Sequence, residues 1–276
     1  MTYRQLIDTL RAAGIDNAAA EARLLACHFT GVSENTLRTE PDAPLPDPNG
    51  QLTAALSQRA NREPLQYLLG TWAFWRQDYE VTPDCLVPRP DTEVLIEQAL
   101  RLLPPGGRFL DLCTGSGCIA ISLLCERPDL TAVAVELSEP TLALAKRNAV
   151  RNGVEEHRLT LLHGDVLTGD FLADLGGFDL IVSNPPYIPT GDLAALPPET
   201  QKEPRLALDG GEDGLLFYRR MLSSDYLAKC KAGGSLLFEI GYDQADALRQ
   251  LTSTRGLNCR IIKDYGGNDR VAWVTE

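Results

Sequence analysis

Apolar and polar residues recur along the first quarter of the chain with the spacing of amphipathic helices. Residues 3–30 carry two apolar stripes, one that includes Leu10 and one that includes Leu25, and they predict two helices. Residues 41–49 contain four prolines and predict a loop, because proline restricts the backbone and lacks a donor. A third helix is expected from about residue 51 to residue 61.

The pattern changes to that of strands further along the chain. Residues 71–82 are aromatic and β-prone and predict a short hairpin. From residue 108 onward, short continuous apolar runs alternate with helical patterns. The expected strands lie at residues 108–112, 131–135, 159–162, 178–183, 235–240, 259–263 and 271–274.

This alternation predicts an α/β fold with a mostly parallel seven-stranded sheet covered by helices on both faces. Three parts are expected: a small helical domain over residues 1–70, a linking β-hairpin over 71–86, and the α/β domain over 87–276. In such sheets ligands bind at the carboxyl ends of the strands, near the point where the strand order reverses. The segments that follow the strands are therefore the places to search for chemistry.

Composition and charge exclude several classes of protein. The net charge of −12 and the absence of a Lys/Arg cluster argue against a stable nucleic-acid partner. No apolar run is long enough to cross a bilayer, and no signal-peptide core is seen, so a cytoplasmic protein is expected. The seven cysteines form no Cys-x-x-Cys pair and the three histidines lack zinc-site spacing, which predicts reduced thiols and no metal.

A glycine-containing loop follows the first strand of the α/β domain and opens a helix. Gly115 and Gly117 allow a tight turn and a close approach of a ligand to the backbone. An ordinary strand-to-helix turn is the plainer interpretation, but Asp-x-x-x-Gly-x-Gly resembles the S-adenosylmethionine loop of Rossmann-like methyltransferases. The candidate cofactor residues are Asp111, Cys113, Thr114, Gly115, Ser116 and Gly117.

Two acids follow the next two strands. Glu136 comes directly after the second strand, where a carboxylate can accept hydrogen bonds from both ribose hydroxyls of an adenosine ligand. Asp165 follows the third strand and can face the adenine amino group. A surface glutamate and a helix-capping aspartate are the plainer interpretations.

The tetrapeptide Asn184-Pro185-Pro186-Tyr187 follows the fourth strand. Its two prolines restrict the backbone and can hold the carbonyls rigidly outward. A planar NH₂ group could then donate one hydrogen to the Asn184 side chain and the other to the Pro185 carbonyl, with Tyr187 against its flat face. A proline-rich turn explains the Pro-Pro pair but not its position after the fourth strand. The tetrapeptide therefore predicts a site that methylates a planar amide or amino nitrogen.

The chain resembles a known family at these positions. Asn-Pro-Pro-Tyr after the fourth strand is the hallmark of methyltransferases that act on adenine N6, cytosine N4 or the glutamine amide. Further segments are similar to the release factor glutamine methyltransferases, the HemK/PrmC family, and the resemblance covers nearly the whole chain. These segments are residues 87–93 (Val-Pro-Arg-Pro-Asp-Thr-Glu), 111–119, 203–208 (Glu-Pro-Arg-Leu-Ala-Leu) and 264–271.

The resemblance implies a Rossmann-like class I methyltransferase domain that uses S-adenosylmethionine and releases S-adenosylhomocysteine. It implies methylation, on N5, of the glutamine of the Gly-Gly-Gln motif in class I peptide chain release factors, which the N-terminal helices help to hold. Asn184 would contact cofactor and substrate, and Pro90 and Thr92 would lie by the methionine end of the cofactor. Cys113 stands where many members have glycine, and Glu136 where many have aspartate. A monomer is expected.

Catalysis would then rest on alignment. A glutamine amide nitrogen is a poor nucleophile, so the protein must place nitrogen, methyl carbon and sulfur in one line. Asn184 and Pro185 would hold the nitrogen and stabilise the positive charge that develops on its hydrogens. Three alternatives stay open: a glutamine methyltransferase of a ribosomal protein, an adenine-N6 nucleic-acid methyltransferase that flips its base, and a cofactor-binding protein without catalysis.

Overall fold

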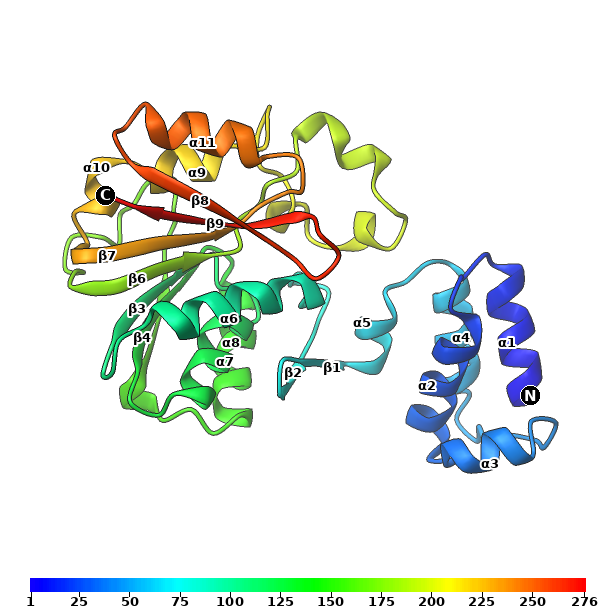
Figure 1. Cartoon of the computed structure of the whole chain (residues 1–276). Coiled ribbons are helices and arrows are strands. Elements are labelled where there is room, and N and C mark those ends of the chain that lie inside the picture. The colour runs from blue at the N-terminus through cyan, green and yellow to red at the C-terminus, as the bar shows by residue number, and fades with distance from the viewer. The chain divides into compact units, whose positions relative to one another are not determined.

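The computed structural model describes residues 1–276, and the chain divides into two compact units. The first unit comprises Met1–Thr71 together with Pro197–Lys202, and the second comprises Trp72–Leu196 together with Glu203–Glu276. Figure 1 labels the elements along the chain. The helices of the first unit are α1 (Tyr3–Ala12), α2 (Ala18–Thr30), α3 (Glu34–Thr39), α4 (Gln51–Ala60) and α5 (Leu65–Leu69).

Local signals in the sequence set the ends of these helices. Thr2 and Gln5 form a capping box at the start of α1, in which each side chain accepts a hydrogen bond from the other residue's backbone nitrogen. Gly31 ends α2 in the left-handed conformation, with φ of 71°. The apolar faces of the helices meet in a core of their own that includes the fully buried Leu6 and Leu25.

Residues far apart in the sequence complete the first unit. The Arg59 guanidinium is 6% exposed and pairs with Glu21 and with Glu199, whose side chain approaches to 3.0 Å. Arg62 also pairs with Glu199, at 2.9 Å, and Lys202 pairs with Glu63. These ion pairs hold the segment Pro197–Lys202 against the helices.

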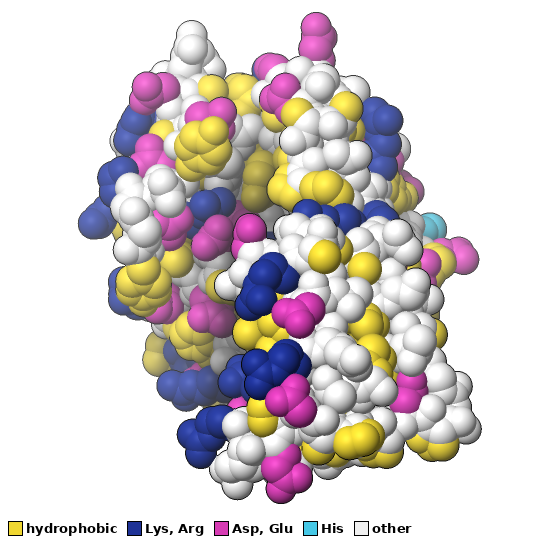
Figure 2. Space-filling model, turned by 90° about the vertical axis from the view of Figure 1, so that its right-hand side faces the viewer, with side chains coloured by type: hydrophobic (Ala, Val, Ile, Leu, Met, Phe, Trp, Pro, Cys, Tyr) yellow, Lys and Arg dark blue, Asp and Glu magenta, His cyan; other side chains and the backbone are white.

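On the face drawn in Figure 2, basic side chains lie interspersed with acidic ones. Exposed ion pairs such as Arg4 with Asp42 and Arg11 with Asp8 fit that distribution. No helix of the structure combines the length and the apolar character needed to cross a bilayer.

The second unit begins with a two-stranded sheet and continues into a seven-stranded sheet. The larger sheet has the order β5-β4-β3-β6-β7-β9-β8, in which β9 alone runs opposite to the other six strands. The strands are β1 (Thr71–Phe74), β2 (Gln77–Glu80), β3 (Arg108–Leu112), β4 (Thr131–Glu136), β5 (Leu159–His163), β6 (Phe178–Ser183), β7 (Cys230–Glu239), β8 (Asn258–Lys263) and β9 (Asp269–Thr275).

Helices cover both faces of the larger sheet (Figure 1). One apolar core joins the sheet to α6 (Glu93–Leu102), α7 (Cys118–Glu126) and α8 (Glu139–Arg151). A second core joins the opposite face to α9 (Leu216–Met221), α10 (Ser224–Leu227) and α11 (Ala245–Ser253). Short 3₁₀ helices lie between these elements: η1 (Pro90–Thr92), η2 (Glu156–Arg158), η3 (Thr190–Ala195), η4 (Thr200–Lys202) and η5 (Arg205–Ala207).

The chain enters the sheet at its centre, runs outward through β4 and β5, and returns to place β6 beside β3. The strand order therefore reverses between β3 and β6, and the carboxyl ends of these two strands flank the expected ligand site. The mostly parallel seven-stranded sheet, the helical N-terminal region and the hairpin are confirmed. The fifth strand begins five residues earlier than expected, at Cys230 instead of residue 235.

Candidate active site

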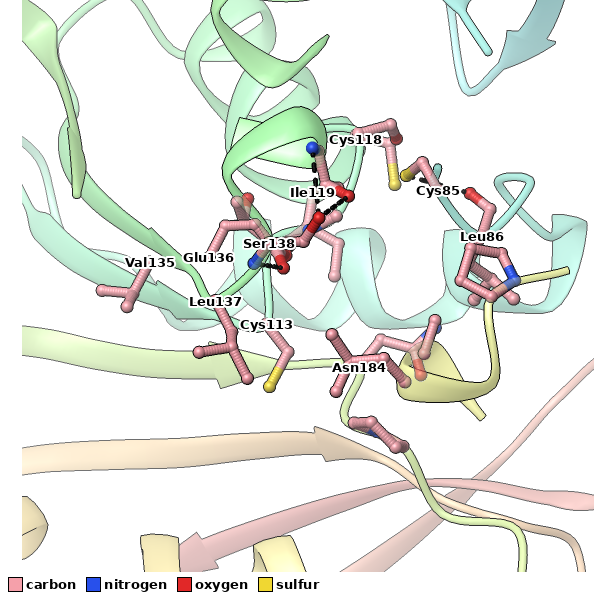
Figure 3. A pocket seen from close by; sticks show the side chains of 18 of the residues that line it. Cys85, Leu86, Cys113, Cys118, Ile119, Val135, Glu136, Leu137, Ser138 and Asn184 are labelled. Atoms are coloured by element: carbon pink, nitrogen blue, oxygen red, sulfur yellow. Dashed lines mark hydrogen bonds between the residues drawn. The ribbon is translucent and has the colours of Figure 1, made fainter. Parts of the chain in front are cut away.

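A cavity opens at the carboxyl ends of the strands, and all the residues that line it belong to the second unit. Figure 3 shows Glu136, at the end of β4, and Asn184, just after β6, within this cavity. The other predicted site residues on its lining are Thr92, Cys113, Thr114, Gly115, Ser116, Asp165 and Pro186. Those that the lining does not include are Pro90, Asp111, Gly117, Pro185 and Tyr187.

The loop after β3 turns through positive φ angles of 58° at Cys113, 57° at Gly115 and 81° at Gly117. A Cβ at Gly117 would lie 2.7 Å from the Ile121 side chain, so glycine also satisfies a packing need there. Cys113 adopts a conformation that favours glycine. This left-handed backbone explains why many members of the family that the chain resembles have glycine where this chain has Cys113.

Asp111 holds this loop from behind. It is fully buried, and its Oδ2 accepts hydrogen bonds from the Thr114 hydroxyl at 2.6 Å and from the Ala120 backbone at 3.3 Å. Its other oxygen has no partner. Asp111 thus ties the loop to the first turn of α7, and a direct contact between Asp111 and the cofactor stays a prediction.

Hydrogen bonds from backbone N–H groups fix the orientation of the Glu136 carboxylate. Its Oε2 accepts a hydrogen bond from the Gly115 nitrogen at 3.0 Å, and its Oε1 accepts one from the Ser138 nitrogen at 2.9 Å. Burial raises the pKa of this carboxyl, while the two backbone donors oppose the shift. Each oxygen keeps a lone pair for a ligand hydroxyl, so a ribose with two adjacent hydroxyls fits this group.

The segment after β5 forms another wall of the cavity. Asp165 accepts a hydrogen bond from the Leu167 nitrogen at 2.8 Å and lines the cavity beside the buried Val166. A Cβ at Gly164 would lie 2.5 Å from the Phe171 ring, so the backbone is packed tightly here. An apolar residue next to an acid suits a flat ring with a polar edge, as an adenine has.

The tetrapeptide is held rigidly. The Asn184 Nδ2 donates a hydrogen bond to the hydroxyl of the buried Thr92 at 3.2 Å, which leaves the Asn184 Oδ1 as its available acceptor. The Tyr187 carbonyl accepts a hydrogen bond from Gln244 Nε2 at 3.0 Å. A Cβ at Gly210 would lie 2.7 Å from the Tyr187 Cα. Burial raises the pKa of the Tyr187 phenol, which keeps it neutral.

Two supporting contacts had no assigned role in the sequence analysis. Glu203 is almost fully buried and accepts hydrogen bonds from the Arg89 guanidinium and from the Val87 nitrogen, the latter at 3.0 Å. These hydrogen bonds fix the start of the segment 203–208. Three residues of this segment line the cavity: Pro204, Leu206 and Ala207. The only sequence signal was the family-like run of residues 203–208.

Three cysteines also line the cavity. Burial raises the pKa of Cys85 and Cys113 well above the usual thiol value and raises that of Cys118 to about 12. These thiols are therefore protonated near neutral pH and poor nucleophiles. Their chemistry supports packing and does not support covalent catalysis.

Two buried carboxyls should give the protein a measurable pH dependence. Burial raises the pKa of Asp111 from 3.8 to about 7 and that of Glu239 from 4.5 to about 7. A raised acid pKa means that the carboxyl binds its proton more tightly in the folded state than in the unfolded state. The contribution of this proton to the free energy of unfolding is therefore complete below the pKa that the carboxyl has in the unfolded chain, and it is lost as pH rises through 7. The free energy of unfolding should fall by about 1.4 kcal/mol per pH unit for each group between about pH 5 and pH 6.

Urea unfolding of the wild type and of Asp111→Asn at several pH values measures this slope. The variant should lose the Asp111 contribution and show a flatter profile. Identical profiles for the two proteins would show that Asp111 is ionised in the folded state.

Comparisons with known proteins place the chain in a family. Residues 2–70 match the PrmC N-terminal domain, and residues 90–195 match the methyltransferase small domain. The chain is 43% identical to the release factor glutamine methyltransferase of Geobacter sulfurreducens, over 98% of this chain and 95% of that protein. It is 41% identical to that of Caulobacter vibrioides, over 96% of this chain and 91% of that protein.

Solved structures support the fold. A methyltransferase from Pyrococcus furiosus superposes with a TM-score of 0.53 at 20% identity, over 71% of this chain and 87% of that one. The hMettl16 catalytic domain, in complex with MAT2A 3'UTR hairpin 1, gives a TM-score of 0.57 at 16% identity, over 81% and 78%. With nearly full-length relatives at about 40% identity, the chain belongs to the release factor glutamine methyltransferase family, whose members are S-adenosylmethionine-dependent enzymes.

Proposed function

We propose that this chain methylates N5 of the glutamine in the Gly-Gly-Gln motif of class I peptide chain release factors, with S-adenosylmethionine as the methyl donor. The observation that supports it most is the held side chain of Asn184, which reaches the same cavity as Glu136 from the neighbouring side of the switch point. Asn184 suits an NH₂ group, and Glu136 suits an adenosine ribose. The cavity therefore has a place for each reactant.

The residues of the cavity fit the cofactor. Glu136 offers two fixed carboxylate oxygens to the ribose hydroxyls, and Gly115 brings backbone close to the ligand. Asp165 and Val166 suit the adenine ring, and Thr92 lies by Asn184, where the methionine end would be bound. When bound, S-adenosylmethionine supplies a methyl group on a sulfonium, which is a strong electrophile.

The tetrapeptide orients the nitrogen that is to be methylated. Because the Asn184 Nδ2 is engaged by Thr92, its Oδ1 can accept one hydrogen of the substrate NH₂, and the Pro185 carbonyl can accept the other. Both acceptors stabilise the positive charge that develops on these hydrogens. Alignment of this kind can lower a barrier by roughly 7–11 kcal/mol. The extra proton becomes acidic after methylation and leaves to solvent, so no dedicated base is required.

The first unit is proposed to bind the release factor. It matches the PrmC N-terminal domain and carries none of the residues that line the cavity. A role in holding the protein substrate therefore suits it better than a role in chemistry.

Separate reactions with one labelled cofactor test the substrate class. The chain is incubated with S-adenosylmethionine labelled in the methyl group and, in turn, a class I release factor, ribosomal protein or duplex DNA. Label should enter the release factor alone. Label in ribosomal protein or DNA, with none in the release factor, would replace the proposal with the corresponding alternative.

Glu136→Ala tests the ribose contact. Hydrogen bonds to a charged group contribute about 1.5–3 kcal/mol, so the affinity for S-adenosylmethionine should fall by about 10- to 150-fold. Titration calorimetry measures this affinity directly. Glu136→Asp is the matched control, since it keeps both oxygens and should bind more tightly than the alanine variant. Equal affinity in the wild type and Glu136→Ala would remove Glu136 from the cofactor site.

A further inference from the structure

A second buried carboxyl lies beside the tetrapeptide. Strands β6 and β7 are parallel neighbours, and their register pairs Ser183 with Phe238. Asn184 directly follows β6 and Glu239 is the last residue of β7, so they occupy adjacent positions at the carboxyl edge of the sheet. Glu239 is 1% exposed, does not line the cavity, and has one oxygen, Oε2, without a hydrogen-bond partner.

Thr92 connects the two side chains. Its hydroxyl accepts a hydrogen bond from the Asn184 Nδ2 at 3.2 Å, and the same hydroxyl acts as a hydrogen-bonding neighbour of the buried Glu239 carboxyl, where it opposes the rise in the pKa of Glu239. A hydroxyl has one hydrogen and two lone pairs, and an ionised carboxylate can only accept. The Thr92 hydrogen must therefore point to Glu239 whenever that carboxyl is ionised. The Thr92 hydroxyl then offers Asn184 only a lone pair. Of the two ends of the Asn184 amide, only the NH₂ group can donate a hydrogen bond to that lone pair.

This chain of bonds decides which end of the Asn184 amide meets the substrate. With the amide nitrogen turned toward Thr92, Oδ1 accepts from the substrate NH₂. If the bonds ran the other way, Thr92 would donate to Oδ1, and the Asn184 NH₂ would face another NH₂ donor. That arrangement would be unproductive, because two donors do not bond to each other.

We propose that Glu239 is a positioning residue that, through the Thr92 hydroxyl, fixes the Asn184 amide with its oxygen toward the substrate nitrogen. This proposal rests on the proposed function, in which Asn184 accepts a hydrogen bond from the amide that is methylated. Glu239 itself touches neither reactant. Its effect should therefore appear in turnover and not in the binding of either reactant.

Glu239→Gln at about pH 8 is the first test. Glutamine keeps the shape but can both donate and accept, so either direction of the hydrogen-bond chain becomes possible. A charge-assisted hydrogen bond is about twice as strong as a neutral one, so we expect kcat to fall on the order of tenfold. The KM for the release factor and the calorimetric affinity for S-adenosylmethionine should stay within about twofold of wild type. Glu156→Gln, on an exposed glutamate, controls for the change in net charge.

Thr92 supplies the second arm of the test. Thr92→Val keeps the shape and removes the hydroxyl, so kcat should fall on the order of tenfold, and adding Glu239→Gln should lower it no further than about twofold. Thr92→Ser keeps the hydroxyl and should recover most of the lost turnover. Coupling of this kind is expected for residues in one hydrogen-bond network.

The pH profile is a readout that a merely structural role would not move. Below its pKa of about 7, protonated Glu239 can donate, and the wild-type kcat should fall. In Glu239→Gln this fall should be absent. The other titratable or charged groups whose charges act on Glu239 are Arg270, Asp91, Arg89, Tyr187, Tyr218 and Cys118. Burial raises the pKa of Tyr187, Tyr218 and Cys118, and the pairs of Arg270 with Asp91 and Asp264 hold Arg270 charged. The three raised groups therefore stay neutral near pH 7, and Arg270 stays positive.

Three results would overturn the proposal: wild-type kcat in Glu239→Gln, independent and multiplying losses in the double variant, or a parallel loss of cofactor affinity. Failure of the proposed function looks different. In that case the wild type itself transfers no methyl group to a release factor, whatever the variants do.

Discussion

Asn184→Ala should lower kcat with a release factor by about 100- to 1,000-fold, the range seen when one preorganised hydrogen-bonding group is removed from an active site. In the proposed function the Asn184 Oδ1 is the acceptor for the substrate nitrogen, because its Nδ2 is engaged by Thr92. Without this acceptor the nitrogen can rotate out of line, and the developing positive charge loses a partner. Turnover under saturating substrate and cofactor measures the loss.

The same variant should bind S-adenosylmethionine within a few-fold of wild type. In the proposed function Glu136 and the loop around Gly115 bind the adenosine from the other side of the switch point, and their contacts do not involve the removed side chain. A calorimetric titration of Asn184→Ala is therefore the control for a damaged site. Full turnover in this variant would contradict the assigned role of Asn184.

Arg59→Leu should destabilise the first unit by about 3–5 kcal/mol, as expected when one partner of a buried ion pair is removed. Arg59 is 5% exposed and bonds to Glu21, to Glu199 and to the Glu63 carbonyl. The variant would leave the half-buried Glu21 carboxylate without its cation. Glu199 would keep only Arg62 as a partner.

Hydrogen exchange read separately for the two units measures this effect. Protection should fall in the helices of the first unit and in residues 197–202, while the strands around the cavity keep theirs. Arg4→Leu is the matched control, because its pair with Asp42 is more than half exposed on both sides and should contribute about 0–1 kcal/mol. Equal effects of the two variants would show that the buried network contributes no special stability.

Much of the fold could be predicted because its central strands are short and mostly apolar. Residues 178–183 matched β6 at both ends, since four of its six residues are apolar. The start of β7 was missed because residues 230–235 include Lys231, Gly233 and Gly234, which weaken a strand pattern. A neighbouring strand, and not local propensity, holds that segment in place.

The residues of the site also include some that the sequence could predict and some that it could not. Glu136 and Asn184 could be predicted because each lies at the carboxyl end of a strand, and parallel strands bring these ends together. Sequence spacing does not show which way a carboxylate points. The predicted contact of Asp111 with the cofactor stays a prediction, and the structure adds that Asp111 is buried with hydrogen bonds from Thr114 and Ala120. The sequence does not distinguish Glu239 from other strand residues. Its position beside Asn184 follows only from the sheet register.

The most direct measurement is a mass spectrum of a class I release factor after incubation with this chain and S-adenosylmethionine. Fragmentation of the peptide that contains Gly-Gly-Gln should show the mass of one added methyl group on the glutamine side chain, and none in a parallel reaction with Asn184→Ala. A methyl group on any other residue, or an unmodified glutamine after incubation with active wild-type enzyme, would contradict the claim that this cavity methylates the release factor amide.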